Sequence, residues 1–207
     1  MSYLGLSNKL AANLAEKHHL DEEKQVVLAF AIEVLVLNIA NAILTLTIGW
    51  ALGVLRGTAV CLLTIAAFRH NAGGGHSDSP WRCAAVTMII FPLLALAAHQ
   101  VSPGQDSYLN ILSAVSILIG FAFIWVFAPV DNPKAPILSP IRRKKLKIWA
   151  LSIMGIITIL ILILRFINWE MAPEIGMCLV LSLLWVSFNL TPWGHRLWSF
   201  IDTISIR

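Results

Sequence analysis

The chain has 207 residues, of which 58% are hydrophobic and only 13% carry a formal charge. Together with a mean hydropathy of +0.79, this composition excludes a soluble domain, which could not hide so much apolar surface. The net charge of +4 does not indicate nucleic acid as a partner, because basic residues in membrane proteins usually mark cytoplasmic loops. The predicted fold class is therefore an all-α integral membrane protein.

Residues 1–25 form a polar segment in which leucines recur among charged side chains. The spacing of these leucines favours an amphipathic helix that lies in the membrane interface. A plain polar tail is the alternative interpretation. The leucines concerned are Leu4, Leu6, Leu10, Leu14 and Leu20.

Six apolar runs follow within residues 26–190, and each is near the length of about 20 residues that a transmembrane helix needs. The first two are separated by little more than Gly49, Trp50 and Gly53, and a tight hairpin between two helices fits their combined length better than one helix. Residues 191–207 are predicted to be a C-terminal tail. The six runs span residues 26–50, 51–68, 81–99, 108–127, 146–167 and 172–190.

The basic residues predict the orientation of these helices. An N-terminus inside the cell places every Lys and Arg on the inner side except Arg56 and Arg165, as the positive-inside rule requires. Both termini are then cytoplasmic, together with the loops at residues 69–83 and 128–147.

The loop at residues 69–83 concentrates reactive side chains, with three glycines in a row, two of the six histidines and one of the three cysteines. Ser79 suits a helix N-cap and Pro80 the first helical position, so Cys83 should fall in the first turn. The helix dipole, with Arg82 beside the sulfur, would favour the thiolate. A nucleophilic Cys83 with His76 as its base is one hypothesis.

Two other interpretations of this loop stay open on the residues alone. His70, His76 and Cys83 could hold a metal, although zinc ligands usually lie closer together in sequence. The loop could equally be a structural hairpin. In the nucleophile hypothesis, the backbone of Gly73, Gly74 and Gly75 or the N–H groups of the next helix could hold an oxyanion.

The loop at residues 128–147 contains four prolines and then a dense basic run. A basic cluster at the start of a helix is usually a topology anchor that binds anionic lipid. The functional alternative is a docking site for an acidic peptide on the same membrane face as Cys83. The basic run consists of Arg142, Arg143, Lys144, Lys145 and Lys147.

The order Arg69-His70, Gly74-Gly75-His76 and Cys83 resembles the active-site loop of the accessory gene regulator B family of bacterial membrane cysteine peptidases. Ala128-Pro129, Pro136-Ile137 and the basic run resemble that family's second motif, and the resemblance covers most of the chain. Ser77 departs from the alanine of many members. Asp78 matches no catalytic residue of the family, so no triad is predicted.

The resemblance implies a cysteine endopeptidase in a bacterial cell membrane, with His76 and Cys83 catalytic on the cytoplasmic side and no cofactor or metal. Arg69, Gly73, Gly74 and Gly75 would support the catalytic loop. The implied partner is a short propeptide with an amphipathic helix and an acidic C-terminal tail, which the basic run would recognise.

The implied reaction removes that tail through a thioester on Cys83 and closes the remainder into a thiolactone or lactone. A homodimer is left open by the resemblance. A small peptide transporter or permease is the rival class, although the chain lacks the internal symmetry of transporter folds.

Overall fold

The computed structural model describes residues 5–17, 21–75, 77, 79–100, 106–131 and 137–203. Within these ranges the chain forms eight helices and no strand. They are α1 (Gly5–Lys17), α2 (Glu22–Ala51), α3 (Leu55–Ala72), α4 (Pro80–His99), α5 (Asp106–Phe127), α6 (Pro140–Phe166), α7 (Ala172–Leu190) and α8 (Pro192–Thr203).

The chain divides into two compact units, Met1–Leu44 and Thr45–Arg207. In the first unit, α1 occupies the middle of the polar segment. Ser7, Ala11 and Ala15 are its buried residues, while Leu10 and Leu14 are exposed. A helix therefore forms where the leucine pattern predicted one, and small residues spaced four apart make its buried face.

Five helices are long and apolar enough to cross a membrane, namely α2, α4, α5, α6 and α7. The second predicted span, residues 51–68, corresponds to α3, which is not among them because polar residues such as Arg56 and Arg69 lie near its two ends. The outward surfaces are apolar: Leu63 and Leu118 are each 70% exposed. An apolar surface of this extent is what lipid covers around a spanning helix.

The hairpin predicted between the first two apolar runs is present. α2 ends at Ala51 and α3 begins at Leu55, and Gly53 in the connecting turn has a φ of 76°. A Cβ atom added to Gly49 would lie only 2.4 Å from Thr58 Oγ1. Glycine at these two positions thus permits both the left-handed turn and the close approach of the two helices.

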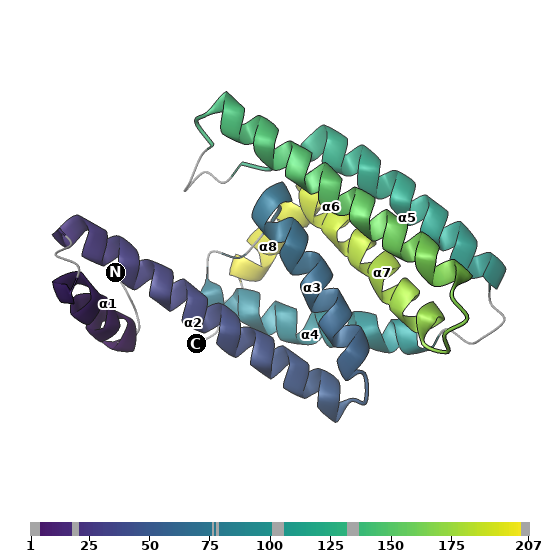
Figure 1. Ribbon diagram of the computed structural model, residues 1–207, viewed down its shortest axis with the longest axis horizontal. Helices are drawn as coiled ribbons and strands as arrows, with labels where there is room; N and C mark the ends of the chain where they lie inside the picture. The colour runs from purple at the N-terminus through teal and green to yellow at the C-terminus, as the bar shows by residue number, and fades with distance from the viewer. Residues whose placement is uncertain are drawn as a thin grey trace. The chain divides into compact units, whose positions relative to one another are not determined.

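The central helix of the second unit is α7, which packs against α3, α4, α5, α6 and α8 (Figure 1). Its buried residues run along its whole length and include Cys178, Val180 and Leu183. Cys178 and Cys61 of α3 are both fully buried in this core. Such burial is typical of cysteines that fill apolar space rather than act as nucleophiles.

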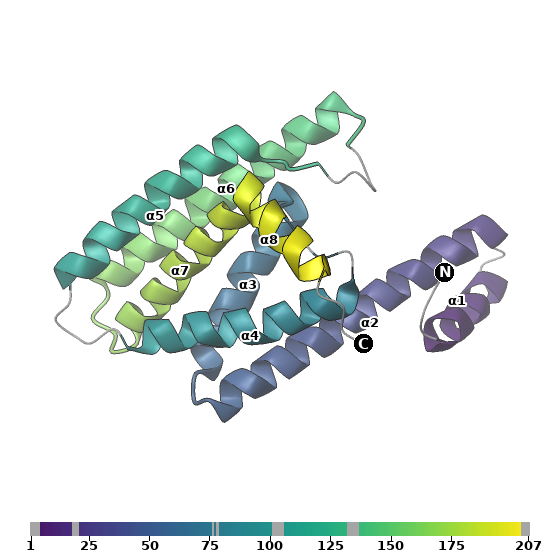
Figure 2. The same ribbon diagram turned by 180° about the vertical axis from the view of Figure 1, so that it is seen from behind.

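The last helix was not predicted, because residues 191–207 were interpreted as a tail. Instead, α8 packs on the end of α7, and its far end lies against the start of α4 (Figure 2). The ends of α3 and α7, the start of α4 and α8 therefore meet at one end of the bundle.

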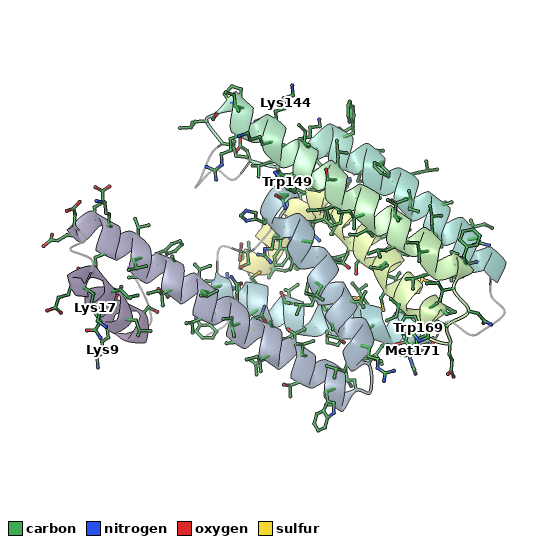
Figure 3. The ribbon with its side chains drawn as sticks, viewed as in Figure 1. Lys9, Lys17, Lys144, Trp149, Trp169 and Met171 are labelled. Carbon is green, nitrogen blue, oxygen red and sulfur yellow. The ribbon has the colours of Figure 1, made fainter. Side chains whose placement is uncertain are left out.

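Figure 3 labels two tryptophans, Trp149 in the first half of α6 and Trp169 just after its last residue. Trp149 is 61% exposed and Trp169 is 46% exposed. Exposed indole rings at two levels are the arrangement expected at the two interfaces of a membrane.

Candidate active site

Cys83 lies in the first turn of α4, as the sequence predicted. Ser79 is the N-cap residue with an extended backbone, Pro80 is the first helical residue, and the Cys83 N–H donates to Ser79 O at 3.1 Å. The thiol is half-buried and carries no disulfide. It therefore sits where the unpaired N–H groups of a helix start give a positive electrostatic potential.

The cation beside this sulfur is Arg69, from the last turn of α3. Arg69 Nη2 donates to Cys83 Sγ at 3.1 Å. The expectation that Arg82 flanks the sulfur is wrong, because neighbouring residues on a helix point in different directions. Arg82 instead donates to Asp202 O of α8 at 2.7 Å and pairs with Asp202 Oδ1 at 3.4 Å.

The glycine run between α3 and α4 is packed tightly on both sides. Gly73 and Gly74 have φ angles of 71° and 117°. A Cβ atom on Gly73 would lie 2.7 Å from Val130 O, and one on Gly75 would lie 2.5 Å from Trp198 Cδ1. Glycine at these positions permits both the positive φ angles of the turn and the close approach of Val130 and Trp198.

One backbone donor of this run is already engaged, because the Gly75 N–H donates to Asn189 O at 2.9 Å. In this conformation it is not directed at a substrate. The remaining oxyanion donors of the sequence hypothesis are the other backbone N–H groups of the run and those of the first turn of α4.

One face of α8 holds the loop in place through residues spaced four apart, Gly194, Trp198 and Asp202. Trp198 contacts Gly75, and Asp202 accepts a short hydrogen bond from Ser77 Oγ. Ser77 Oγ in turn accepts the Ser79 N–H at 3.1 Å. We call this set of three residues the α8 face.

His76 and Asp78 lie outside the described residues, so the assignment of His76 as the base stays a prediction. Gly75 is fixed to Asn189, and Ser77 is fixed to Asp202. His70 is described and is exposed. Among the described residues, no three His, Cys, Asp or Glu side chains lie close enough to hold a metal ion.

The basic run of loop 128–147 divides into two groups. Arg143 pairs with Asp131, which also accepts the Ile137 N–H at 2.7 Å. Lys147 Nζ donates to Trp125 O at 2.6 Å and lies 4.9 Å from the centre of that indole ring. These two cations hold the loop and helix together. The other three, Arg142, Lys144 and Lys145, are exposed at the start of α6.

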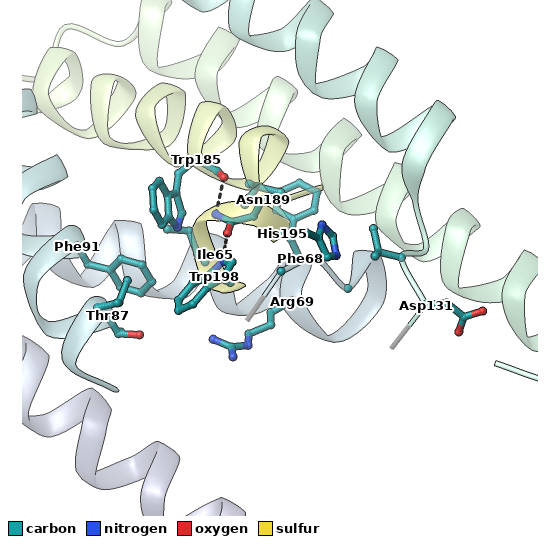
Figure 4. Close-up of a pocket in the computed structure, with 16 residues that line it drawn as sticks. Ile65, Phe68, Arg69, Thr87, Phe91, Asp131, Trp185, Asn189, His195 and Trp198 are labelled. Atoms are coloured by element: carbon teal, nitrogen blue, oxygen red, sulfur yellow. Dashed lines mark hydrogen bonds between the residues drawn. The ribbon is translucent and has the colours of Figure 1, made fainter. Parts of the chain in front are cut away.

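A cavity of about 400 Å³ lies beside the glycine run. Side chains of α3, α4, α7 and α8 line it (Figure 4). Arg69, which contacts the Cys83 sulfur, is part of its wall.

Comparison with known proteins identifies the chain's relatives. The family model described as AgrB, accessory gene regulator B, matches residues 7–190. The chain belongs to this family. Membership in the AgrB family implies a role in processing the quorum-sensing peptide of the accessory gene regulator system, and with the apolar helices it indicates a membrane protein.

Individual AgrB relatives are similar over most of their length. An AgrB-like protein of Clostridium perfringens strain SM101 is 23% identical over 206 residues, covering 97% of this chain and 96% of the relative. Accessory gene regulator protein B of Staphylococcus aureus strain Newman is 28% identical over 160 residues, covering 76% of this chain and 80% of the relative. No solved structure matches the chain.

Two parts of this candidate site are not predicted by the sequence, namely Asn189 and the α8 face. Asn189 accepts the Gly75 N–H through its backbone and the Trp198 Nε1–H through its side chain, the latter at 2.6 Å. Both parts are more than a hundred residues away from the loop in sequence. The only local signal was the spacing of Gly194, Trp198 and Asp202, which places them on one helical face.

Replacing Gly75 by alanine should disrupt the site, because the new methyl group would overlap Trp198. Overpacking of this kind destabilises by about 1–3 kcal/mol, and we expect cleavage of the propeptide to fall while the protein remains in the membrane. The matched control is Gly155→Ala in α6, where nothing lies within 4 Å of the new atom. Wild-type cleavage by the Gly75→Ala protein would contradict the packing argument.

Replacing Arg69 by glutamine should slow every reaction of the Cys83 thiol. A hydrogen bond to a charged group contributes about 1.5–3 kcal/mol, and about half of this is offset because a stabilised thiolate is a weaker nucleophile. We therefore expect Cys83 alkylation by iodoacetamide at pH 7 to slow by roughly 3- to 10-fold. Arg82→Gln is the matched control, since Arg82 contacts Asp202 instead of the sulfur. Equal alkylation rates in the wild type and Arg69→Gln would show that the contact does not activate the thiol.

Proposed function

We propose that this chain is a membrane-embedded cysteine endopeptidase that removes the C-terminal tail of a short autoinducer propeptide and promotes its cyclisation. The observation that carries the proposal is the 3.1 Å contact between Arg69 Nη2 and Cys83 Sγ at the start of α4. A guanidinium and a helix N-terminus both stabilise a thiolate. Gly75 and Ser77 are anchored to Asn189 and Asp202, which supports a preorganised loop beside this thiol.

In the first step, the Cys83 thiolate attacks the carbonyl carbon at the end of the signal segment. The oxyanion that forms accepts hydrogen bonds from backbone N–H groups of the loop and the first turn of α4. The C–N bond then breaks, and the leaving amine of the tail takes its proton from the His76 imidazolium. The signal segment remains on Cys83 as a thioester.

In the second step, a thiol or hydroxyl inside the signal segment attacks the thioester carbonyl. Its proton passes to His76, and the Cys83 thiolate is released as the ring closes to a thiolactone or lactone. Thioester exchange is nearly balanced in energy, whereas thioester formation from an amide is uphill, so the tail must depart and water must stay excluded. The apolar helices around the loop support that requirement.

The experiment that tests this proposal uses the full-length protein in lipid vesicles with a synthetic propeptide that has an N-terminal amphipathic helix and an acidic C-terminal tail. Mass spectrometry should detect the released tail, a Cys83 acyl-enzyme in rapidly quenched samples, and a product lighter than the linear signal segment by one water. If the tail is released but the signal segment is found only in its linear form, the protein would be a simple hydrolase that does not promote cyclisation. An intact propeptide that crosses the vesicle membrane would support the transporter alternative.

The exposed cations Arg142, Lys144 and Lys145 are proposed to attract the acidic tail. Neutralising all three to glutamine should raise KM by about 10-fold and change kcat little, because exposed ion pairs contribute about 0.2–1 kcal/mol each. Added salt should reduce the difference between variant and wild type. Kinetics at two salt concentrations would measure both effects.

The matched control for this variant neutralises Lys9, Lys17 and Lys24, which changes the net charge equally at another part of the chain. Protease accessibility of the termini should be compared in both variants. An unchanged KM in correctly inserted protein would leave the three cations as a topology anchor only.

A further inference from the structure

Part of the cavity beside the glycine run is lined by apolar side chains, while Arg69, Asp131 and His195 line other parts of it. Phe68 of α3, Phe91 of α4 and Val186 of α7 line it and are all buried. Figure 4 shows the indole rings of Trp185 and Trp198 on the same side as Phe91. The volume of the cavity, about 400 Å³, lies near the lower end of the range of roughly 300–1,000 Å³ for small-ligand pockets.

Polar side chains of this wall have partners within the protein. Asp131 pairs with Arg143, His195 Nδ1 lies 2.9 Å from Thr191 O, and Asn189 makes two hydrogen bonds. Asn189 Nδ2 donates to Trp185 O at 2.8 Å, and Asn189 Oδ1 accepts the Trp198 Nε1–H at 2.6 Å. Both hydrogen bonds are drawn in Figure 4. A charged or strongly polar occupant would lose its hydration without gaining these groups as partners. The cavity therefore suits an apolar occupant.

The cavity is adjacent to the proposed nucleophile through two of its lining residues. Arg69 donates to Cys83 Sγ at 3.1 Å, and Thr87 Oγ1 donates to Cys83 O at 2.8 Å. Val86, one helical turn beyond the thiol, also lines the cavity. A peptide bond placed at Cys83 would thus have its flanking side chains within reach of this space.

We propose that the cavity binds a large apolar side chain of the peptide residue that contributes the scissile carbonyl. This inference rests on the proposed peptidase function. After the tail leaves, only contacts with the acyl half can hold the thioester in place until the ring closes. An apolar side chain in the cavity provides that contact and displaces water next to the thioester.

The test uses two affinity labels that differ in one side chain, acetyl-Ala-Ala-Phe-chloromethyl ketone and acetyl-Ala-Ala-Ala-chloromethyl ketone. Each reacts when a thiolate displaces chloride and forms a C–S bond. The full-length protein in nanodiscs is treated with each label, and mass spectrometry follows modification of the Cys83 peptide. Burial of the phenyl ring should make the Phe label react about 10-fold faster or more.

Val86→Phe places a ring in the cavity, so the phenyl group of the Phe label can no longer enter it. The ratio of the reaction rates of the Phe and Ala labels should then fall to about 1. The matched control is Ile89→Phe on the same helix, which is 58% exposed and does not line the cavity. That control should keep the wild-type ratio. If Val86→Phe does not fold, Val86→Ala takes its place, and its larger cavity should favour a naphthylalanine label over the Phe label more than the wild type does.

Equal reaction of the two labels with wild-type Cys83 would overturn the proposed cavity function, as would a ratio that neither Val86 variant changes. Failure of the peptidase proposal would look different. In that case Cys83 would react with both labels no faster than a free peptide thiol, and Cys83→Ala protein would still process the propeptide.

Discussion

Replacing Cys83 by alanine is expected to abolish propeptide cleavage while the protein still inserts into the membrane. The proposed reaction passes through a bond to this sulfur, and loss of a covalent nucleophile typically lowers turnover by roughly 1,000-fold or more. Tail release measured by mass spectrometry, with the protein quantified in the membrane fraction, would check the result. Cys83→Ser tests the same step, because an unactivated hydroxyl is a much weaker nucleophile than a thiolate.

The other two cysteines supply the matched controls. Cys61 and Cys178 are buried in the core between α3 and α7, where Cys61 Sγ contacts Cys178 O at 3.8 Å. Alanine at either position removes one small buried group, and we expect most of the activity to remain. Full cleavage by the Cys83→Ala protein would exclude Cys83 as the nucleophile and with it the proposed cysteine-peptidase mechanism.

Replacing His76 by alanine is expected to produce the second large loss. A general acid and base contributes about 100- to 10,000-fold, and both proposed steps move a proton through this ring. The measurement is single-turnover tail release over a range of pH. His70→Ala is the matched control, since His70 is exposed at the end of α3 and has no proposed role. Equal losses in the two variants would remove the basis for assigning the base to His76.

A chelator experiment separates this role from a metal site. Dialysis against a zinc chelator should leave cleavage unchanged if His76 acts as a base. Inactivation by the chelator, followed by recovery with added zinc, would instead assign His70, His76 and Cys83 to a metal.

Local patterns were sufficient to predict the long helices and the start of α4. Ser79 and Pro80 encode a helix start within a few residues, and Cys83 follows in its first turn. Gly53 marks the hairpin between α2 and α3 for the same reason, because a left-handed turn residue acts locally. The weakest prediction was the second span, residues 51–68, because Arg56 and Arg69 make the ends of α3 polar.

The contacts that assemble the candidate site were not predictable in this way. Arg69 reaches Cys83 from the preceding helix, while Arg82, the nearer residue in sequence, points to Asp202. Which of the two arginines faces the sulfur depends on how α3 and α4 pack against each other and against α7. A sequence pattern reports the face of a helix but not which neighbour covers it.

The position of the α8 face in the chain determines when the candidate site can assemble during synthesis. The glycine run and Ser77 leave the ribosome long before Trp198 and Asp202, which fix them. At about 5–20 residues per second, several seconds pass between synthesis of the thiol and synthesis of its last support. The nascent chain therefore carries a thiol whose loop is not yet clamped, and the site matures only when translation reaches the final helix.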